Sequence, residues 1–158
     1  MEIRHFIPTL LILLALSTPP SVGASPAEPV LSKGQTVYVP VYSHIYIGPK
    51  KQHFQLSSTL SVRNTDMAGS FRITAVDYYD NNGRLVKRLL AKPAPLTALA
   101  SADFHIEMND VTGGFGANFI VRWEADRQIN APVIECVMIG STIGQGISFV
   151  SSGRVIQP

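Results

Sequence analysis

The sequence predicts an all-β fold: a single antiparallel β-sandwich of seven or eight strands. Short runs in which apolar and polar residues alternate recur along the chain, and this is the pattern of half-buried strands. Turn-forming residues separate these runs, and no helical pattern follows residue 24. The connections are short, which favours antiparallel pairing, because a parallel crossover needs a dozen or more residues.

Residues 1–24 have the features of a cleaved signal peptide. Arg4 and His5 precede an apolar run from Phe6 to Leu16, and small residues end at Ala24. We expect cleavage after Ala24, or alternatively after Ala27. The apolar run has about eleven residues, fewer than the roughly twenty that span a bilayer, although an uncleaved anchor is the alternative. The expected location is therefore the periplasm or the exterior, with no membrane span after cleavage.

Residues 25–34 are predicted to be a flexible linker, because closely spaced prolines prevent regular pairing. Residues 35–158 form the predicted sandwich domain. Its expected strands are residues 35–46, 55–63, 70–79, 84–90, 103–108, 118–125, 132–140 and 147–156, with a break at Gly153 as the alternative for the last one.

Several residues refine the first half of this domain. Pro40 cannot donate to a ladder, so its strand is expected to be an edge strand or to be kinked between two sheets. The apolar phase shifts between Ile73 and Val76, which predicts a bulge or burial on both faces. Asn82-Gly83 is the strongest signal for a tight hairpin.

The second half begins with a predicted crossover loop, residues 91–100, in which Leu96 and Leu99 are expected to plug the core. Trp123 is expected to be buried with Phe119 and Val121 on the same face, and a turn is expected at residues 126–130. The strand at 132–140 is the most apolar, so it is expected to be central.

Composition excludes several classes of protein. The 158 residues carry 13 Lys and Arg against 11 Asp and Glu, a net charge of +2. No basic block exceeds Lys50-Lys51, so no nucleic-acid partner is expected. A single cysteine excludes an intramolecular disulfide and a CxxC zinc site. Cys136 is expected to be a buried small hydrophobe, with an intermolecular disulfide or a metal thiolate as the alternatives.

No catalytic signature is present, and no cofactor or metal is expected. The chain has no G-x-S-x-G elbow, and Gly113–Gly116 lacks the spacing of a dinucleotide fingerprint. His44, His53 and His105, with Cys136 and Met138, are ligand types for a soft metal such as copper, but their spacing is unfavourable. Glu135 is expected to point outward or to pair with a residue such as Arg122.

Two groups of residues are candidates for binding. Tyr38, Tyr42 and Tyr46 recur at a spacing of four, which on a strand places them on one face, and tyrosine is enriched at interfaces. Packing within the sandwich is the alternative role. The second group is Gly113, Gly114 and Asn118, in a loop that a ligand or partner backbone could approach closely, with simple turn geometry as the alternative.

The motifs together resemble a known family. They are Tyr38–Tyr46, Leu60–Asp66, Val76–Asp80 with Gly83, Gly113–Phe119, Val137–Gly140 and Gln145–Phe149. This combination resembles a family of small exported bacterial proteins, domain of unknown function 3124, over about residues 35–156. The resemblance implies an extracytoplasmic location and one domain, and it brings no activity. Its turns are similar to those of immunoglobulin-like bacterial modules, so an immunoglobulin-like sandwich is expected.

These observations favour an exported, non-catalytic binding or accessory module of the bacterial cell envelope, with an envelope protein or a glycan as its partner. The alternative is a structural or assembly subunit that pairs through edge strands. An enzyme or a copper-binding protein is disfavoured. The residues do not identify the ligand or the oligomeric state.

Overall fold

The computed structural model describes residues 30–142 and 144–158 as a protein of twelve β-strands without a helix. The predicted signal peptide, residues 1–24, lies outside these ranges. The strands are β1 (Leu31–Pro40), β2 (His44–Ile47), β3 (Gln52–Gln55), β4 (Ser57–Arg63), β5 (Phe71–Tyr79), β6 (Leu85–Arg88), β7 (Ala94–Leu96), β8 (Ser101–Ile106), β9 (Asn118–Asn130), β10 (Val133–Thr142), β11 (Gln145–Ser152) and β12 (Arg154–Gln157).

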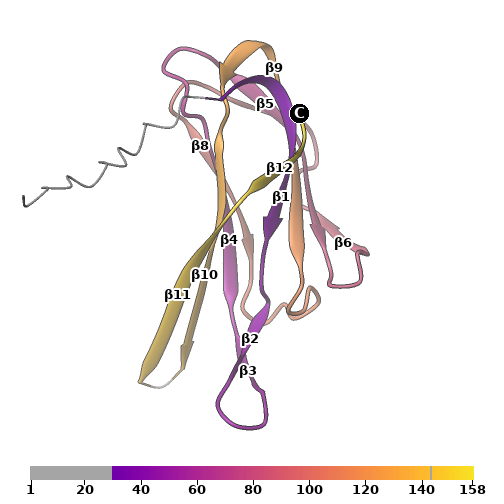
Figure 1. The fold of residues 1–158 in the computed structure, drawn as a ribbon, viewed down its shortest axis with the longest axis vertical. Helices are drawn as coiled ribbons and strands as arrows, with labels where there is room; N and C mark the ends of the chain where they lie inside the picture. The colour runs from indigo at the N-terminus through magenta and orange to yellow at the C-terminus, as the bar shows by residue number, and fades with distance from the viewer. Residues whose placement is uncertain (1–29, 143) are drawn as a thin grey trace, which may run out of the picture.

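Two antiparallel sheets face each other (Figure 1). One has the order β12-β1-β9-β5-β6, with β7 also paired to β5, and the other has the order β11-β10-β4-β8. The hairpin β2–β3 forms a third, two-stranded sheet that extends from one end of the molecule. All pairings are antiparallel, which confirms the prediction of an antiparallel all-β fold.

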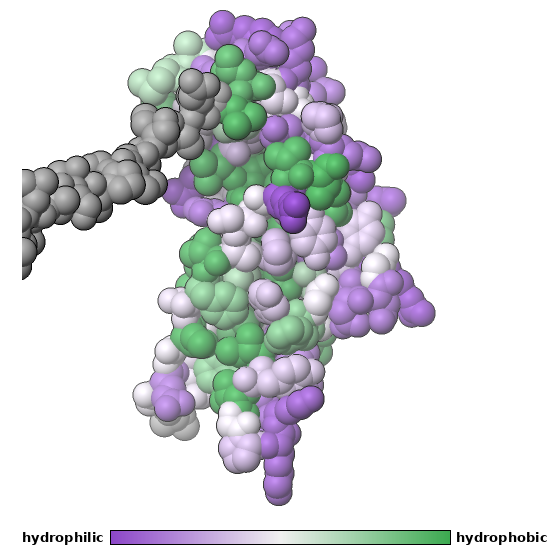
Figure 2. Space-filling model, in the orientation of Figure 1, coloured by the Kyte–Doolittle hydropathy of each residue, from purple (hydrophilic) through white to green (hydrophobic). Residues whose placement is uncertain are grey.

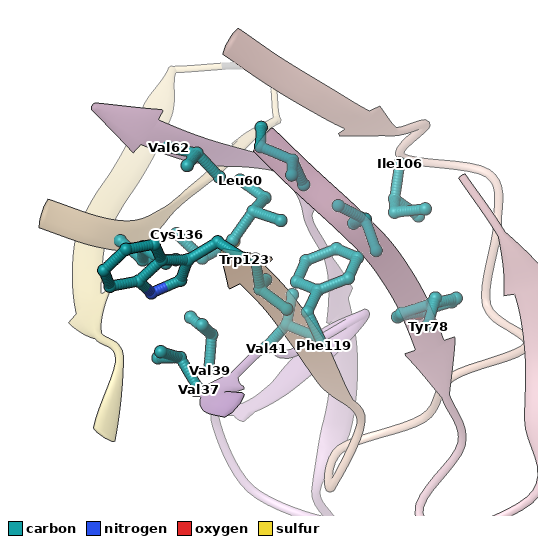
Figure 3. Packing of buried hydrophobic residues seen from close by; sticks show 14 of the residues in the cluster. Val37, Val39, Val41, Leu60, Val62, Tyr78, Ile106, Phe119, Trp123 and Cys136 are labelled. Carbon is teal, nitrogen blue, oxygen red and sulfur yellow. The ribbon is translucent and has the colours of Figure 1, made fainter. Parts of the chain in front are cut away.

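The core lies between the two sheets and follows the predicted alternation. Leu60 and Val62 of β4 point inward from one sheet, and Phe119 of β9 points inward from the other (Figure 3). Val121 of β9 belongs to the same buried cluster. Trp123 is buried on the same face of β9, as predicted. Burying each such side chain contributes about 1.5–3 kcal/mol, so this layer holds the two sheets together.

Pro40 ends β1 at a place where a missing N–H has no consequence. β1 lies between β12 and β9, so it is not an edge strand, but β12 covers only Thr36 to Tyr38. The N–H of Val41 donates to the carbonyl of Ala117 on the β9 side, at 3.0 Å. The nitrogen of Pro40 therefore faces the opposite, uncovered side, since successive residues of a strand alternate. The chain then leaves the sheet for β2, which agrees with the predicted kink.

The strand count exceeds the seven or eight predicted because several predicted strands are divided. Residues 35–46 are split at Pro40 into β1 and β2, the start of 55–63 belongs to β3, and the crossover contains the short β7. The last strand breaks at Gly153, as expected. A Cβ there would lie 2.7 Å from the Ile134 carbonyl oxygen and 2.7 Å from Val37, so only glycine fits where the chain crosses between the sheets.

Two strand boundaries and the burial of one side chain differ from the prediction. β1 begins at Leu31, so residues 31–34 belong to the sheet and not to the linker. Residues 126–130 form no turn, because β9 bulges there and rejoins β1 through Ile129, whose buried side chain holds it in the sheet. Leu99 is 61% exposed and therefore does not plug the core, whereas Leu96 is buried as expected.

Three local predictions are confirmed. The pairing of β5 with β9 shifts register between Ile73 and Ala75, which is the expected bulge. Gly83 has a φ of 74° in the hairpin between β5 and β6. The strand at 132–140 corresponds to β10, which has β11 and β4 as neighbours and is therefore internal to its sheet.

Candidate functional site

The β2–β3 hairpin extends from one end of the molecule (Figure 1). Six aromatic rings gather around its base, and we call this group the aromatic end: Tyr42, His44, Tyr46, His53, Phe115 and Phe149. It combines residues from the segment between β1 and β2, from the β2–β3 hairpin, from the 113–118 loop and from β11. The two predicted binding groups, the tyrosines and the glycine-rich loop, therefore lie together.

The outer layer of the aromatic end is a pair of exposed rings. Tyr46 is 46% exposed and Phe115 is 45% exposed. Their ring centroids are 5.5 Å apart with an interplanar angle of 24°, so the two rings stack. Offset stacking of this kind contributes about 0.5–1.5 kcal/mol beyond the buried area. Exposed rings that are fixed in this way form a preorganised contact surface.

A second stacked pair supports the first. The rings of His44 and His53 lie 4.1 Å apart at 8°, and Tyr46 meets both edge-on, at 5.3 and 5.2 Å. Burial, and then the neighbouring His53, lower the pKa of His44 below its ordinary value of 6.5. His44 is therefore neutral at physiological pH. Its Nε2 atom is buried and has no protein hydrogen-bond partner.

The 113–118 loop is fastened to the core through Ser43. The Ser43 N–H donates to the carbonyl of Gly114 at 3.0 Å, and the carbonyl of Ser43 accepts from Leu56 N–H at 3.0 Å. The Ser43 hydroxyl is also hydrogen-bonded to the buried Tyr78 hydroxyl at 3.0 Å. Burial raises the pKa of Tyr78, so it stays protonated. Phe115 is thus presented by a loop that cannot move without breaking buried hydrogen bonds.

The predicted loop residues have supporting positions. A Cβ on Gly113 would lie 2.6 Å from Cζ of Tyr78, so the loop's close approach is to the protein's own ring. Gly114 has a φ of 75°, which favours glycine. Asn118 starts β9 and is paired with Pro40 in β1. The large exposed side chain of this loop is that of Phe115, which was not among the predicted binding residues.

The three tyrosines all border Phe115, although they do not share one regular strand. Tyr42 meets the Phe115 ring edge-on at 5.1 Å and is partly buried against the core. Tyr38 lines a shallow hollow of about 150 Å³ together with Tyr42 and Phe115. The sequence presents His44 and His53 as metal-ligand types and does not predict their stacking beside Tyr46. This stacking depends on the register of β2 and β3, which pairs Tyr46 with His53 and is a tertiary feature.

Several charged side chains elsewhere are engaged in ion pairs. Asp77 pairs with Arg122 at 3.0 Å. Glu135 lies on the outer face of β10, as expected, and its partner is Arg63, at 3.8 Å, and not Arg122. In the part of the chain that the structure describes, no three His, Cys, Asp or Glu side chains gather as a metal site would require. Burial raises the pKa of the Cys136 thiol to about 12.

Comparisons with known proteins place the chain in a family. Within residues 30–142 and 144–158, no helix is long and apolar enough to cross a membrane. No curated protein matches the sequence. The crystal structure of Thermotoga maritima 1070 is similar at 10% identity and a TM-score of 0.46, over 76% of this chain and 92% of that chain. Residues 34–156 match the family described as Protein of unknown function (DUF3124), so the chain belongs to this family, in agreement with the resemblance seen in its motifs.

Proposed function

We propose that this protein is an exported, non-catalytic binding module of the bacterial cell envelope, and that it contacts its partner through the aromatic end. The observation that carries the proposal is the stacked and half-exposed pair Tyr46–Phe115. Exposure of apolar ring surface to water is unfavourable, and a partner that covers the rings removes this cost. Aromatic residues are accordingly enriched at protein interfaces. Because the loop is held through Ser43, little ordering entropy opposes binding.

The residues around the Tyr46–Phe115 pair favour a protein partner over a glycan. Ile47 of the same hairpin is exposed, and it lines an open cavity with Ile147 at the start of β11. Aliphatic neighbours extend an apolar contact, whereas a sugar site needs several polar groups aimed at hydroxyls. Lys50 and Lys51 form the turn of the hairpin, so the partner surface is expected to be neutral or acidic beside its apolar patch.

Export is the second part of the proposal, and it rests on the signal-like features of residues 1–24. The position of Cys136 supports it, because a fully buried thiol with a pKa of about 12 does not react in an oxidising compartment. N-terminal sequencing of protein from the envelope fraction is expected to begin at Ser25 or Glu28. An intact Met1 on cytoplasmic protein would contradict export.

The immunoglobulin-like description of the sandwich also belongs to this proposal. It is supported by two facing antiparallel sheets between which the chain crosses repeatedly, as from β9 to β10 and from β11 to β12. The non-catalytic assignment is supported by the pairing of acidic side chains with arginines, as in Asp77–Arg122, since a carboxylate engaged in such a pair is not free to contact a substrate.

The experiment is site-specific crosslinking in the envelope. A photoreactive phenylalanine analogue at position 46 is expected to capture a defined envelope protein, while the same analogue at position 99 does not. Leu99 is the matched control because it is also exposed and lies at the opposite end of β4 from the hairpin. Its position is given by its neighbour Ala100, whose carbonyl accepts a hydrogen bond from the N–H of Asn64, just after β4. Equal crosslinking at both positions would refute the assignment of the aromatic end.

Affinity for the captured protein provides the second readout. Replacing Tyr46 and Phe115 together by serine is expected to weaken binding by roughly 30-fold or more, because the loss of one central interface aromatic costs about 2 kcal/mol and two such losses do not simply add. Leu99→Ser is expected to leave binding unchanged. Tyr42 is not used, because it packs against the core and its loss would affect folding.

The glycan alternative is tested by titrating the protein with soluble cell-wall oligosaccharides. Saturable shifts of the NMR signals of Tyr46 would favour a glycan partner over a protein partner.

A further inference from the structure

The four edges of the two large sheets are not equally protected. β8 carries Asp103 and His105, β6 carries Lys87 and Arg88, and β12 has four residues with Arg154 at its start. β11 has eight residues and contains neither a charge nor a proline. Natural edge strands avoid self-pairing by being short or by carrying charges or prolines. β11 alone among these edges lacks such a feature.

The free side of β11 offers hydrogen-bonding groups in a regular row. Gly153 N–H donates to the Ile134 carbonyl at 2.8 Å. Because the residues that hydrogen-bond to the neighbouring strand alternate along an antiparallel pair, the odd-numbered residues of β11 direct their backbone groups towards β10. The backbone groups of Gly146, Ser148 and Val150 therefore point away from β10. Within residues 30–142 and 144–158, β10 is the one strand that pairs with β11.

Apolar side chains lie next to this row. Ile147 is 40% exposed and Val150 is 55% exposed, and Ile139 on the adjacent β10 is 51% exposed. Figure 2 shows apolar surface over the side of the molecule where β11 lies, in contrast to the polar surface over β6. A strand added to this edge would gain hydrogen bonds and cover apolar area together.

We propose that β11 pairs with β11 of a second copy of this chain, antiparallel and about a two-fold axis at Ser148. This arrangement joins the two four-stranded sheets into one continuous sheet. Ile147 then lies opposite Phe149 of the second copy, on the same face, and such pairs of an aromatic with a β-branched residue stabilise sheets. Val150 lies opposite Gly146 of the second copy, which leaves room for its side chain.

A second copy is the occupant because β11 is self-complementary. Two-fold pairing about Ser148 brings that residue opposite its own copy, so a charge at or near the axis would meet a like charge. The run from Cys136 to Ser152 contains no charged residue, and that conflict is absent. The inference does not depend on the proposed function, because its test reads the mass of the protein and not the capture of a partner. The two surfaces adjoin, since Phe149 of β11 belongs to the aromatic end and Ile147 lies beside it.

The test is the solution mass of the purified protein, measured by size exclusion with light scattering across a range of concentrations. The wild type is expected to have twice the monomer mass. Ser148→Lys places two lysines opposite each other at the axis and is expected to weaken the dimer by about tenfold or more. Ser61→Lys is the matched control, because Ser61 lies on the same sheet face but in the internal strand β4, between Glu135 and Asp103. It is expected to leave the dimer intact.

A second variant keeps the test decisive if Ser148→Lys does not fold. Mild oxidation of Ser148→Cys is expected to yield a covalent dimer, whereas Ser61→Cys is expected to remain uncrosslinked, and the buried Cys136 does not take part. A monomeric wild type at every soluble concentration would overturn the proposal. So would a folded Ser148→Lys variant with undiminished dimer affinity, or equal crosslinking of the two cysteine variants.

Discussion

Gly113→Ala tests whether the aromatic end depends on the buried Tyr78 beneath it. Gly113 is buried, and its carbonyl accepts from Asn81 N–H at 3.0 Å, so the loop cannot shift freely. The added Cβ would lie 2.6 Å from Cζ of Tyr78 and 2.7 Å from Cβ of Ala117, and closer still to the Tyr78 hydroxyl. The ring or the loop must therefore move.

The expected loss of stability is the sum of two contributions. Overpacking a well-packed site costs about 1–3 kcal/mol. Displacing Tyr78 also removes its hydrogen bond to Ser43, worth about 0.5–1.5 kcal/mol. We expect the free energy of unfolding to fall by about 1.5–4.5 kcal/mol. At about 3–5 °C per kcal/mol for a domain of this size, the melting temperature should fall by roughly 5–22 °C.

The assay is urea and thermal unfolding followed by the fluorescence of Trp123. Gly83→Ala is the first control: Gly83 has a φ of 74° but open space around its Cβ position, so only backbone strain of about 1–2 kcal/mol applies. Tyr78→Phe in the Gly113→Ala background removes the closest atom and is expected to recover part of the loss. An unchanged melting temperature for Gly113→Ala, or no recovery by Tyr78→Phe, would show that the contact does not limit the loop.

Three further predictions concern single residues. Trp123→Ala is expected to lower the free energy of unfolding by about 3–5 kcal/mol, and the wild-type emission is expected at the short wavelengths of a buried indole; emission typical of hydrated indole would contradict this. Backbone N–H groups of Ala68, Asn130 and Gly69 hold the pKa of Asp66 below 3.8, so its stabilisation is complete above that pH and is lost as pH falls through the lower, folded-state pKa. In acid titrations followed by circular dichroism, Asp66→Asn is therefore expected to show a smaller loss of stability below about pH 4 than the wild type, and equal acid sensitivity of both would count against it. Because the pKa of Cys136 is about 12 and its side chain is buried, a thiol reagent at neutral pH is expected to label it only after unfolding, and rapid labelling of the folded protein would exclude this placement.

Much of the local structure of this protein could be predicted from the amino-acid sequence. Alternation in residues 57–63 and 118–123 identified the inward faces, because a strand repeats every two residues and water excludes apolar side chains. Gly83 and the shift between Ile73 and Val76 identified a hairpin and a bulge, because both are decided by backbone sterics within a few residues. The motifs also pointed to the family.

Features that depend on contacts between residues far apart in the chain became visible only in the folded structure. The turn expected at 126–130 is a bulged strand end, because Leu31 and Ser32 pair with Asn130 and Ile129 across the sheet. Phe115 became part of the candidate site only through its contacts with Tyr42 and Tyr46, about seventy residues earlier. Such contacts depend on which strands become neighbours, and local propensity carries no information about that choice, since sheet pairing is made between segments distant in sequence.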